Sequence, residues 1–281
     1  MKKPQLISSV LLFSLLMGTG GMISGQDKDT VRYNEYGVAV ARTPLQVERR
    51  NGVLVFESKD QKSRVWTDIR VQADGAAFFG DTYNPIGTGT SIRRARMAFK
   101  TLFGEHWYGE IDMDISNSEL ELKDAYLKYS FNKHSEGDGL EIQVGNFKEP
   151  FSMETTTTSR YLTFIERANV VATFGPSRHI GIMGSYYKNW FLALGSISFQ
   201  NIGGLEERTF SEDANKDFGV DEGYAYTGRI VLMPGYANPD LGLHFGFAGS
   251  YRTPTTDAEL PGSFRYSTRS LTSINRKKYL D

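Results

Sequence analysis

Apolar and charged side chains alternate over segments of about ten residues, and this feature most constrains how the chain can fold. In the segment 91–102, the apolar positions are Ala95, Met97 and Phe99, and the charged positions of the other parity are Arg94, Arg96 and Lys100. In the segment 107–115, the charged positions are Glu110, Asp112 and Asp114. Successive side chains of a β-strand point to opposite faces, so each segment would have one apolar and one charged face. Charged faces that carry both signs favour an all-β transmembrane antiparallel β-barrel, with lipid outside and water inside.

The beginning of the chain has the pattern of an export signal. Lys2 and Lys3 precede the apolar run 6–17, and a stretch rich in small residues follows at 18–25. The apolar run is too short to span a bilayer as a helix, but its length is typical of a secretory signal. We therefore predict that residues 1–25 are a signal peptide and are removed by cleavage.

Composition excludes several other classes of protein. The chain has no cysteine, which excludes disulfide scaffolds, thiolate metal sites and cysteine nucleophiles. The net charge of -1 predicts no affinity for nucleic acid. The mean hydropathy of -0.38 argues against a helical membrane protein, whereas a barrel needs only alternate residues to be apolar. None of the four histidines lies in an H-E-x-x-H motif, and G-x-S-x-G and P-loop motifs are absent from the sequence, so we predict neither an enzyme nor a cofactor or metal site.

From residue 64 onward the sequence predicts nine strands. They are 64–79, 91–102, 106–116, 121–131, 139–147, 179–187, 190–200, 223–233 and 241–251. The polar residues 26–62 are expected to form a periplasmic lead-in, with one further short strand at 53–57. Short connections between the nine strands alternate with mostly longer ones. A barrel with short turns at one rim and longer loops at the other has this arrangement.

Two features of the chain bear on its completeness and on its function. Bacterial single-chain barrels have an even number of strands, whereas nine are predicted here, and the polar stretch 267–281 ends the chain inside what would be an outer loop. We therefore expect residues 63–281 to be the N-terminal part of a barrel that is truncated at its C-terminus.

The connection 148–178 is 31 residues long, and a loop of this length without predicted structure is usually functional.

Five stretches of the chain have a familiar order and spacing. They are DIRVQADGAAFF (68–79), IRRARMAFKTLFGEHWYGEIDMDI (92–115), ELKDAYLKY (121–129), VGNFKEPFSMETTTTSRYLTFIER (144–167) and GPSRHIGI (175–182). Together they resemble the phosphate-selective porin O/P family. The resemblance implies a sixteen-stranded barrel in the outer membrane of a Gram-negative bacterium, assembled as a homotrimer. It also implies that the loop 148–178 folds into the barrel and narrows the pore.

The resemblance further implies an anion site built from three arginines. One comes from the first strand, one from the start of the second and one from the constriction loop, and by motif they are Arg70, Arg94 and Arg167. Guanidinium suits this role because its planar fork donates two hydrogen bonds to an oxyanion and stays charged. We expect the same pore to be lined by Arg96, Lys100 and Arg160.

One position departs from the family pattern. The best-known phosphate binders of the family carry a lysine near the start of the constriction helix, and the matching residue here is Thr155. A hydroxyl group adds no charge, so this site is expected to hold anions more weakly. The sequence thus predicts passive diffusion of small anions such as phosphate through an arginine-lined constriction, with outer-membrane lipids and small anions as partners.

Several alternatives remain open at this stage. Arg96 and Lys100 can instead be lumen charges that only balance the acidic residues of the next strand. The pattern D-x-N-x-D-F-G-x-D at 213–221 is compatible with a calcium loop, although a solvated acidic loop fits better because no helices flank it. Aromatic loop residues would suit an oligosaccharide-admitting porin; they are Tyr161, Phe164 and Phe174. Two further interpretations remain: a barrel that only anchors or binds a partner, and a soluble secreted barrel.

Overall fold

The computed structural model describes a defined part of the chain. The described residues are 32–33, 35–40, 45–50, 52–80, 87–116, 118–132, 138–202, 223–238, 240–253, 266, 268–269, 274 and 278–280. The predicted signal peptide and the acidic pattern at 213–221 lie outside them. The chain divides into two units, Met1–Thr43 and Pro44–Asp281. In the first unit, β1 (Arg32–Tyr33) pairs with β2 (Ala39–Val40) in antiparallel fashion.

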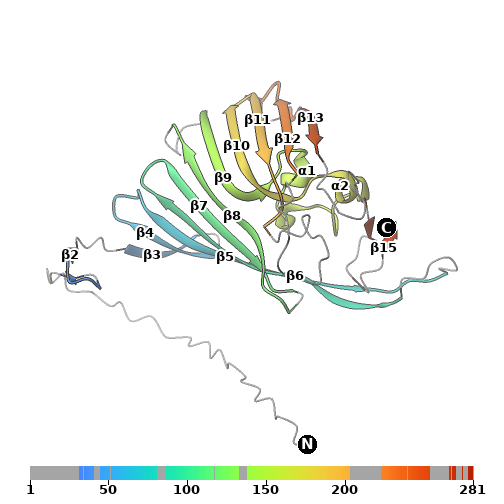
Figure 1. The fold of residues 1–281 in the computed structure, drawn as a ribbon, viewed down its shortest axis with the longest axis horizontal. Helices are drawn as coiled ribbons and strands as arrows, with labels where there is room; N and C mark the ends of the chain where they lie inside the picture. Colours follow the sequence, from blue (N-terminus) through green and yellow to red (C-terminus); the bar gives the residue numbers. More distant parts are fainter. Residues whose placement is uncertain are drawn as a thin grey trace, which may run out of the picture. The chain divides into compact units, whose positions relative to one another are not determined.

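The second unit contains one eleven-stranded antiparallel sheet in which every strand pairs with its neighbours in sequence. Its strands are β3 (Leu45–Arg50), β4 (Val53–Ser58), β5 (Arg64–Ala76), β6 (Gly89–Phe103), β7 (Trp107–Asp114), β8 (Glu121–Ser130), β9 (Gly139–Lys148), β10 (Arg178–Lys188), β11 (Phe191–Ser198), β12 (Ala225–Leu232) and β13 (Phe245–Arg252). All nine strands predicted from residue 64 onward are present, as β5 to β13. The sheet is strongly curved (Figure 1).

The strand β3 was not predicted, although the sequence carries a local signal for it. Gly52, between β3 and β4, has a φ of 84°, which an L side chain adopts only with strain. The sequence there is Asn51-Gly52, a dipeptide typical of two-residue hairpin turns. The carboxylate of Glu57 on β4 then accepts hydrogen bonds from Arg50 and from Arg64 on the flanking strands. The short strand predicted at 53–57 is therefore present as β4, and β3 adds one strand to the sheet before it.

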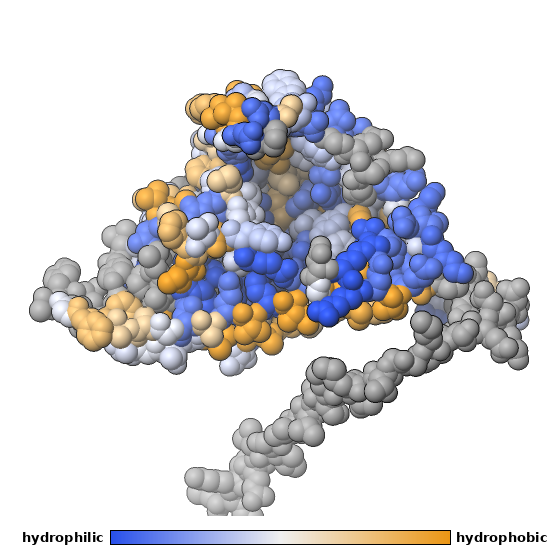
Figure 2. Space-filling view, turned by 180° about the vertical axis from the view of Figure 1, so that it is seen from behind, coloured by the Kyte–Doolittle hydropathy of each residue, from blue (hydrophilic) through white to orange (hydrophobic). Residues whose placement is uncertain are grey.

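The two faces of the sheet differ as the alternation predicts. Apolar side chains on the outer face are open to the surroundings: Phe99 is 43% and Ile111 49% exposed. On the inner face Asp112 is only 4% and Arg94 8% exposed, because charged side chains there pack against one another. Figure 2 shows hydrophilic residues gathered in the hollow of the sheet and hydrophobic residues along its outer edge. No helix in the described ranges is long and apolar enough to cross a membrane.

A bulge interrupts the alternation at the start of β6. Gln72 pairs with Arg94, but the next residue, Ala73, pairs with Ile92, so Arg93 is the extra residue. Arg93 and Arg94 are both buried, each 8% exposed, and both take part in inner-face ion pairs. A β-bulge re-aims a side chain in this way. Simple parity had assigned only Arg94 to the inner face.

The connection between β9 and β10, residues 149–177, contains the helical elements of the sheet unit described here. They are α1 (Met153–Thr156), the short 3-10 helix η1 (Ser159–Tyr161) and α2 (Asn169–Phe174). The Ser152 hydroxyl caps α1 by accepting a hydrogen bond from the Thr155 backbone N–H at 3.0 Å. Both α1 and α2 lie on the inner side of the curved sheet, near β12 and β13 (Figure 1). We call residues 149–177 the pore loop.

The last described residues also belong to the sheet unit. The short strands β14 (Thr268–Arg269) and β15 (Lys278–Leu280) pair with each other. Between them Ile274 is 1% exposed, and its side chain lies beside Gly89 at the start of β6. The ring of Tyr266 lies 5.2 Å from that of Phe174 in the pore loop.

Candidate functional site

The pore loop is held to β5 by hydrogen bonds from the sheet wall. Arg70 Nη1 donates to the hydroxyls of Thr158 at 2.7 Å and Ser159 at 3.1 Å. Gln72 donates from its side-chain amide to the Ser159 carbonyl at 3.3 Å. Arg160 of the loop forms an ion pair with Asp68, which is also on β5. The loop therefore lies against the inner face at the charged strand on which Arg70 was predicted to line a pore.

A second contact joins the pore loop to β6 through Glu166. One of its carboxylate oxygens, Oε2, accepts hydrogen bonds from Arg94 and from Arg93 Nη1, the latter at 2.9 Å. The other oxygen lies 3.5 Å from Nη1 of Arg167. The remaining nitrogens of Arg167 donate to the carbonyls of Glu154 at 2.8 Å and Thr157 at 2.5 Å. Arg94 and Arg167, which the sequence placed in one site, thus meet at the two oxygens of one carboxylate.

The electrostatic state of Glu166 follows from this environment. Burial by itself would raise the pKa of the carboxyl group, because it disfavours the charged form. The Arg167 backbone N–H and the guanidinium groups of Arg94 and Arg93 outweigh this effect and hold the pKa of Glu166 below its usual value. Glu166 is therefore an ionised carboxylate at neutral pH.

The far side of the pore loop is fixed by a buried cluster around Glu149. This side chain is fully buried and accepts a hydrogen bond from Thr227 of β12 at 2.5 Å. Its Oε1 atom lies 2.7 Å from His179 Nδ1 and also pairs with Arg252 of β13. Burial would raise the pKa of Glu149, but these partners hold it below its usual value. Nearby, Arg229 of β12 donates to the Thr156 hydroxyl at 3.3 Å.

Below the loop, charged side chains of different strands pair across the inner face, between neighbouring strands or, for Arg178 of β10 and Asp124 of β8, past the strand between them. Arg96 Nε donates to Asp114 at 2.8 Å, and Lys100 lies 3.5 Å from Glu110. Arg178, which the sequence did not single out, donates to the Asp124 carboxylate at 2.7 and 2.9 Å. Arg96 and Lys100 thus each have a carboxylate partner on the next strand. The alternative interpretation, in which these two residues balance the acidic residues of that strand, requires such pairs.

A cavity of about 340 Å³ lies between this wall and the loop. Among the described residues, six basic and four acidic side chains line it: Arg70, Arg96, Lys100, Lys148, Arg160 and Arg178, with Asp68, Glu110, Asp112 and Asp124. Four of the six predicted site residues therefore share one space. Arg94 and Arg167 lie outside this lining and form the separate cluster around Glu166.

Thr155 and three unpredicted residues complete the picture of the inner face. Thr155 is 7% exposed, and its hydroxyl accepts a hydrogen bond from Ser152 at 2.8 Å, so it serves the loop's own structure. Arg93, Glu149 and Glu166 were missed as site residues. Glu166 and Glu149 both lie in the quoted family stretch 144–167. Each is next in sequence to a basic residue, Arg167 and Lys148 respectively, and this was the available signal for a role in the site. Arg93 also lies in a quoted stretch, beside Arg94, but parity assigned it to the outer face, and its actual direction depends on the bulge.

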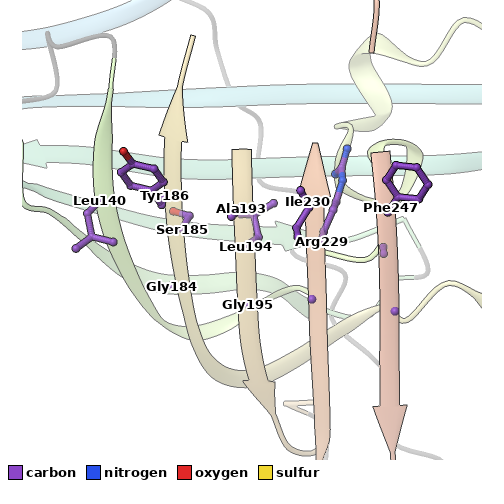
Figure 3. A pocket seen from close by; sticks show the side chains of 13 residues that line it. Leu140, Gly184, Ser185, Tyr186, Ala193, Leu194, Gly195, Arg229, Ile230 and Phe247 are labelled. Carbon is purple, nitrogen blue, oxygen red and sulfur yellow. The ribbon is translucent and has the colours of Figure 1, made fainter. Parts of the chain in front are cut away.

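The outer face has a depression of a different kind. It has a volume of about 640 Å³ and spans β9 to β13 (Figure 3). Across four successive strands the register aligns four exposed glycines: Gly184, Gly195, Gly228 and Gly249. Around them lie apolar side chains that include Leu140, Ile230 and Phe247. The described outer surface is therefore apolar where it is hollowed, whereas the inner cavity is lined by charges.

These observations define the class of protein. A curved antiparallel sheet with an apolar outer face, a charged inner face and a long loop folded onto the charged face is the architecture of a porin. The family model for phosphate-selective porins O and P matches residues 65–275, and the chain belongs to this family. The predicted all-β porin fold is thereby confirmed.

A curated relative gives no further functional information. A protein of Caulobacter vibrioides, described only as uncharacterized, is 25% identical over 168 residues. The match covers 60% of this chain and 32% of that protein, so the chain spans about one third of the length of this relative.

Proposed function

We propose that the protein is an outer-membrane porin that admits small anions by passive diffusion past the pore loop. The observation that carries the proposal is the position of arginines from three elements around this loop. Arg70 of β5 binds η1, Arg94 of β6 binds Glu166, and Arg167 belongs to the loop itself. In a narrow passage with low-dielectric walls, fixed guanidinium groups attract anions and replace part of their hydration shell.

The excess of basic over acidic side chains in the inner cavity supports an anion preference. Pairing with carboxylates lowers the affinity of each cation for a passing anion, and a conducting site must bind weakly enough to release its solute. The absence of a lysine at Thr155 acts in the same direction. The proposal is therefore a shallow series of anion contacts rather than one tight phosphate site. Homotrimeric assembly, which the family resemblance implies, and cleavage of residues 1–25, which the leader pattern of the sequence indicates, remain part of the proposal.

Reversal potentials across a KCl gradient, measured with the protein in planar bilayers, test the proposal. The parent protein should favour chloride over potassium. Arg70→Gln removes one charge from the cavity but keeps a donor for Thr158, and it should lower the anion-to-cation permeability ratio about tenfold, as a change of about 1.4 kcal/mol would. Lys128→Gln is the matched control, because Lys128 is on the inner face and pairs with Glu141 at 3.1 Å, near the opposite ends of the strands. A parent without anion preference contradicts the proposal.

A second candidate function is passage of oligosaccharides. Tyr161 and Phe164 of the pore loop are 73% and 81% exposed, and exposed aromatic faces can stack against sugar rings. Concentration-dependent block of the KCl current by neutral oligosaccharides, reduced in Phe164→Ala, would favour this candidate. Block by inorganic phosphate without block by sugars favours the anion porin.

A further inference from the structure

Three guanidinium groups surround the carboxylate of Glu166. Arg93 and Arg94 reach it from β6, and Arg167 is its neighbour in the pore loop. Glu166 Oε1 also accepts a hydrogen bond from the Arg167 backbone N–H at 3.0 Å. These contacts, donors from several directions on two oxygens of one anionic group, are those that a small oxyanion would make with arginines.

The charges in this cluster do not cancel. Arg93 has a second carboxylate partner, Asp74, but the other side-chain partner of Arg94 is the neutral amide oxygen of Gln72, at 2.9 Å. Arg167 otherwise donates to backbone carbonyls. Among the residues that the structure describes, three basic groups thus face two acidic ones, and removal of the Glu166 charge would leave Arg94 and Arg167 with neutral acceptors as their described partners.

Glu166 also differs from the other loop carboxylate that binds the wall. Its side chain is 20% exposed, whereas that of Glu149 is fully buried. A solute in the lumen can therefore reach the Glu166 cluster without unfolding the loop, but it cannot reach Glu149. The cluster combines an excess of positive charge, forked donors and access from the lumen.

We propose that Glu166 is a built-in competitor for the anion, held in the guanidinium cluster and displaced by an oxyanion during passage. This inference rests on the proposed function and adds one point to it, which is the identity of the residue that weakens anion binding. A phosphate-like group can engage several guanidinium groups through separate oxygens, whereas chloride has a single atom to offer.

The test compares block of the chloride current by inorganic phosphate in planar bilayers. Glu166→Gln keeps the size of the side chain and removes its charge, and we expect half-block at about one tenth of the parental phosphate concentration, the change that about 1.4 kcal/mol produces. Glu141→Gln is the control. Glu141 faces the same lumen and binds Lys128 and Ser130 near the opposite ends of the strands, so its variant should stay within about twofold of the parent.

The outcomes separate this inference from the proposed function. A parental or higher half-blocking concentration in Glu166→Gln, with clear block of the parent, overturns the competitor role and leaves the anion porin standing. Absence of phosphate block in the parent and in both variants overturns the proposed function as well. If Glu166→Gln fails to insert, Glu166→Asp replaces it: the shorter side chain reaches fewer guanidinium groups and should lower half-block by a smaller factor, and a parental or higher value again overturns the inference.

Discussion

The two halves of the sheet present different inner walls to the same pore loop. In β5 to β8 the wall is dense in charge, and its ion pairs run from strand to strand. In β10 to β12 the buried inner positions are mostly small and hydroxylated: Ser185, Ser196, Ser198, Ala225 and Thr227. The charged half binds the loop through several partly solvated pairs, and the small-residue half binds it through one buried cluster.

This difference has a physical reason. Small side chains leave room on the inner side of β10 to β13, and α1 and α2 lie beside that wall (Figure 1). A backbone packed so closely excludes water, so the anchor there must be completely paired, as Glu149 is. On the charged half, the side chains that bind the loop are partly exposed, so water as well as the charged wall solvates these contacts. The fully buried anchor of the loop and the partly exposed charged contacts thus lie on different halves of the sheet.

The largest expected effect is at the buried anchor. Glu149→Ala leaves Arg252 and His179 without their carboxylate, and loss of one partner from a buried charge cluster costs about 3–5 kcal/mol. The midpoint of urea unfolding in detergent micelles should fall accordingly, and the loop should become sensitive to protease. Glu119→Ala, at an exposed position, should stay within about 0.5 kcal/mol of the parent. An equally small effect of Glu149→Ala would mean that the small-residue half does not anchor the loop.

A smaller loss of stability is expected from charged substitutions on the outer face, and its size should be similar in the two halves of the sheet. Ile111→Lys on β7 and Ile230→Lys on β12 each place a charge on an exposed apolar surface. In a bilayer such a change costs about 2–4 kcal/mol near the midplane. Folding into lipid vesicles should be impaired in both variants to a similar degree. A lysine tolerated at both positions would contradict the assignment of this face to lipid.

Acid should loosen the loop through both of its carboxylates. The pKa values of Glu149 and Glu166 are held below the usual value of about 4.3, so their charged forms stabilise the docked loop above that pH. This contribution is lost as the pH falls below 4.3 and through the lowered pKa values, by about 1.4 kcal/mol for each unit of depression. Protease sensitivity of the loop measured against pH should rise only in this acid range. A rise between pH 6 and 8 would indicate a different titrating group.

The smallest effect on stability is expected at a partly exposed pair. Arg160 is 35% exposed in its ion pair with Asp68, and such pairs contribute about 0–1 kcal/mol. Arg160→Gln should therefore leave the unfolding midpoint almost unchanged while lowering the preference for anions. A loss of stability comparable to that of Glu149→Ala would show that the charged half anchors the loop as strongly as the other half.

The sequence alone determined the strands, the two faces and the position of the loop. The nine strands predicted from residue 64 onward correspond to β5–β13, because side-chain alternation with a period of two is a local property of each segment. It also named the loop and most of the cations that line the inner cavity. The short strand predicted at 53–57 is β4, and β3, which was missed, was within reach of the same reasoning through Asn51-Gly52.

Only the tertiary structure decided which charges meet. The bulge that turns Arg93 inward arises from the pairing of β5 with β6, and the single-strand pattern does not contain it. The partners of Glu166 on β6 lie 72 and 73 residues away in sequence, and the partners of Glu149 come from three different strands. The sequence supplied charges of both signs, but an ion pair depends on distance. Strand register and the folded path of the loop set that distance.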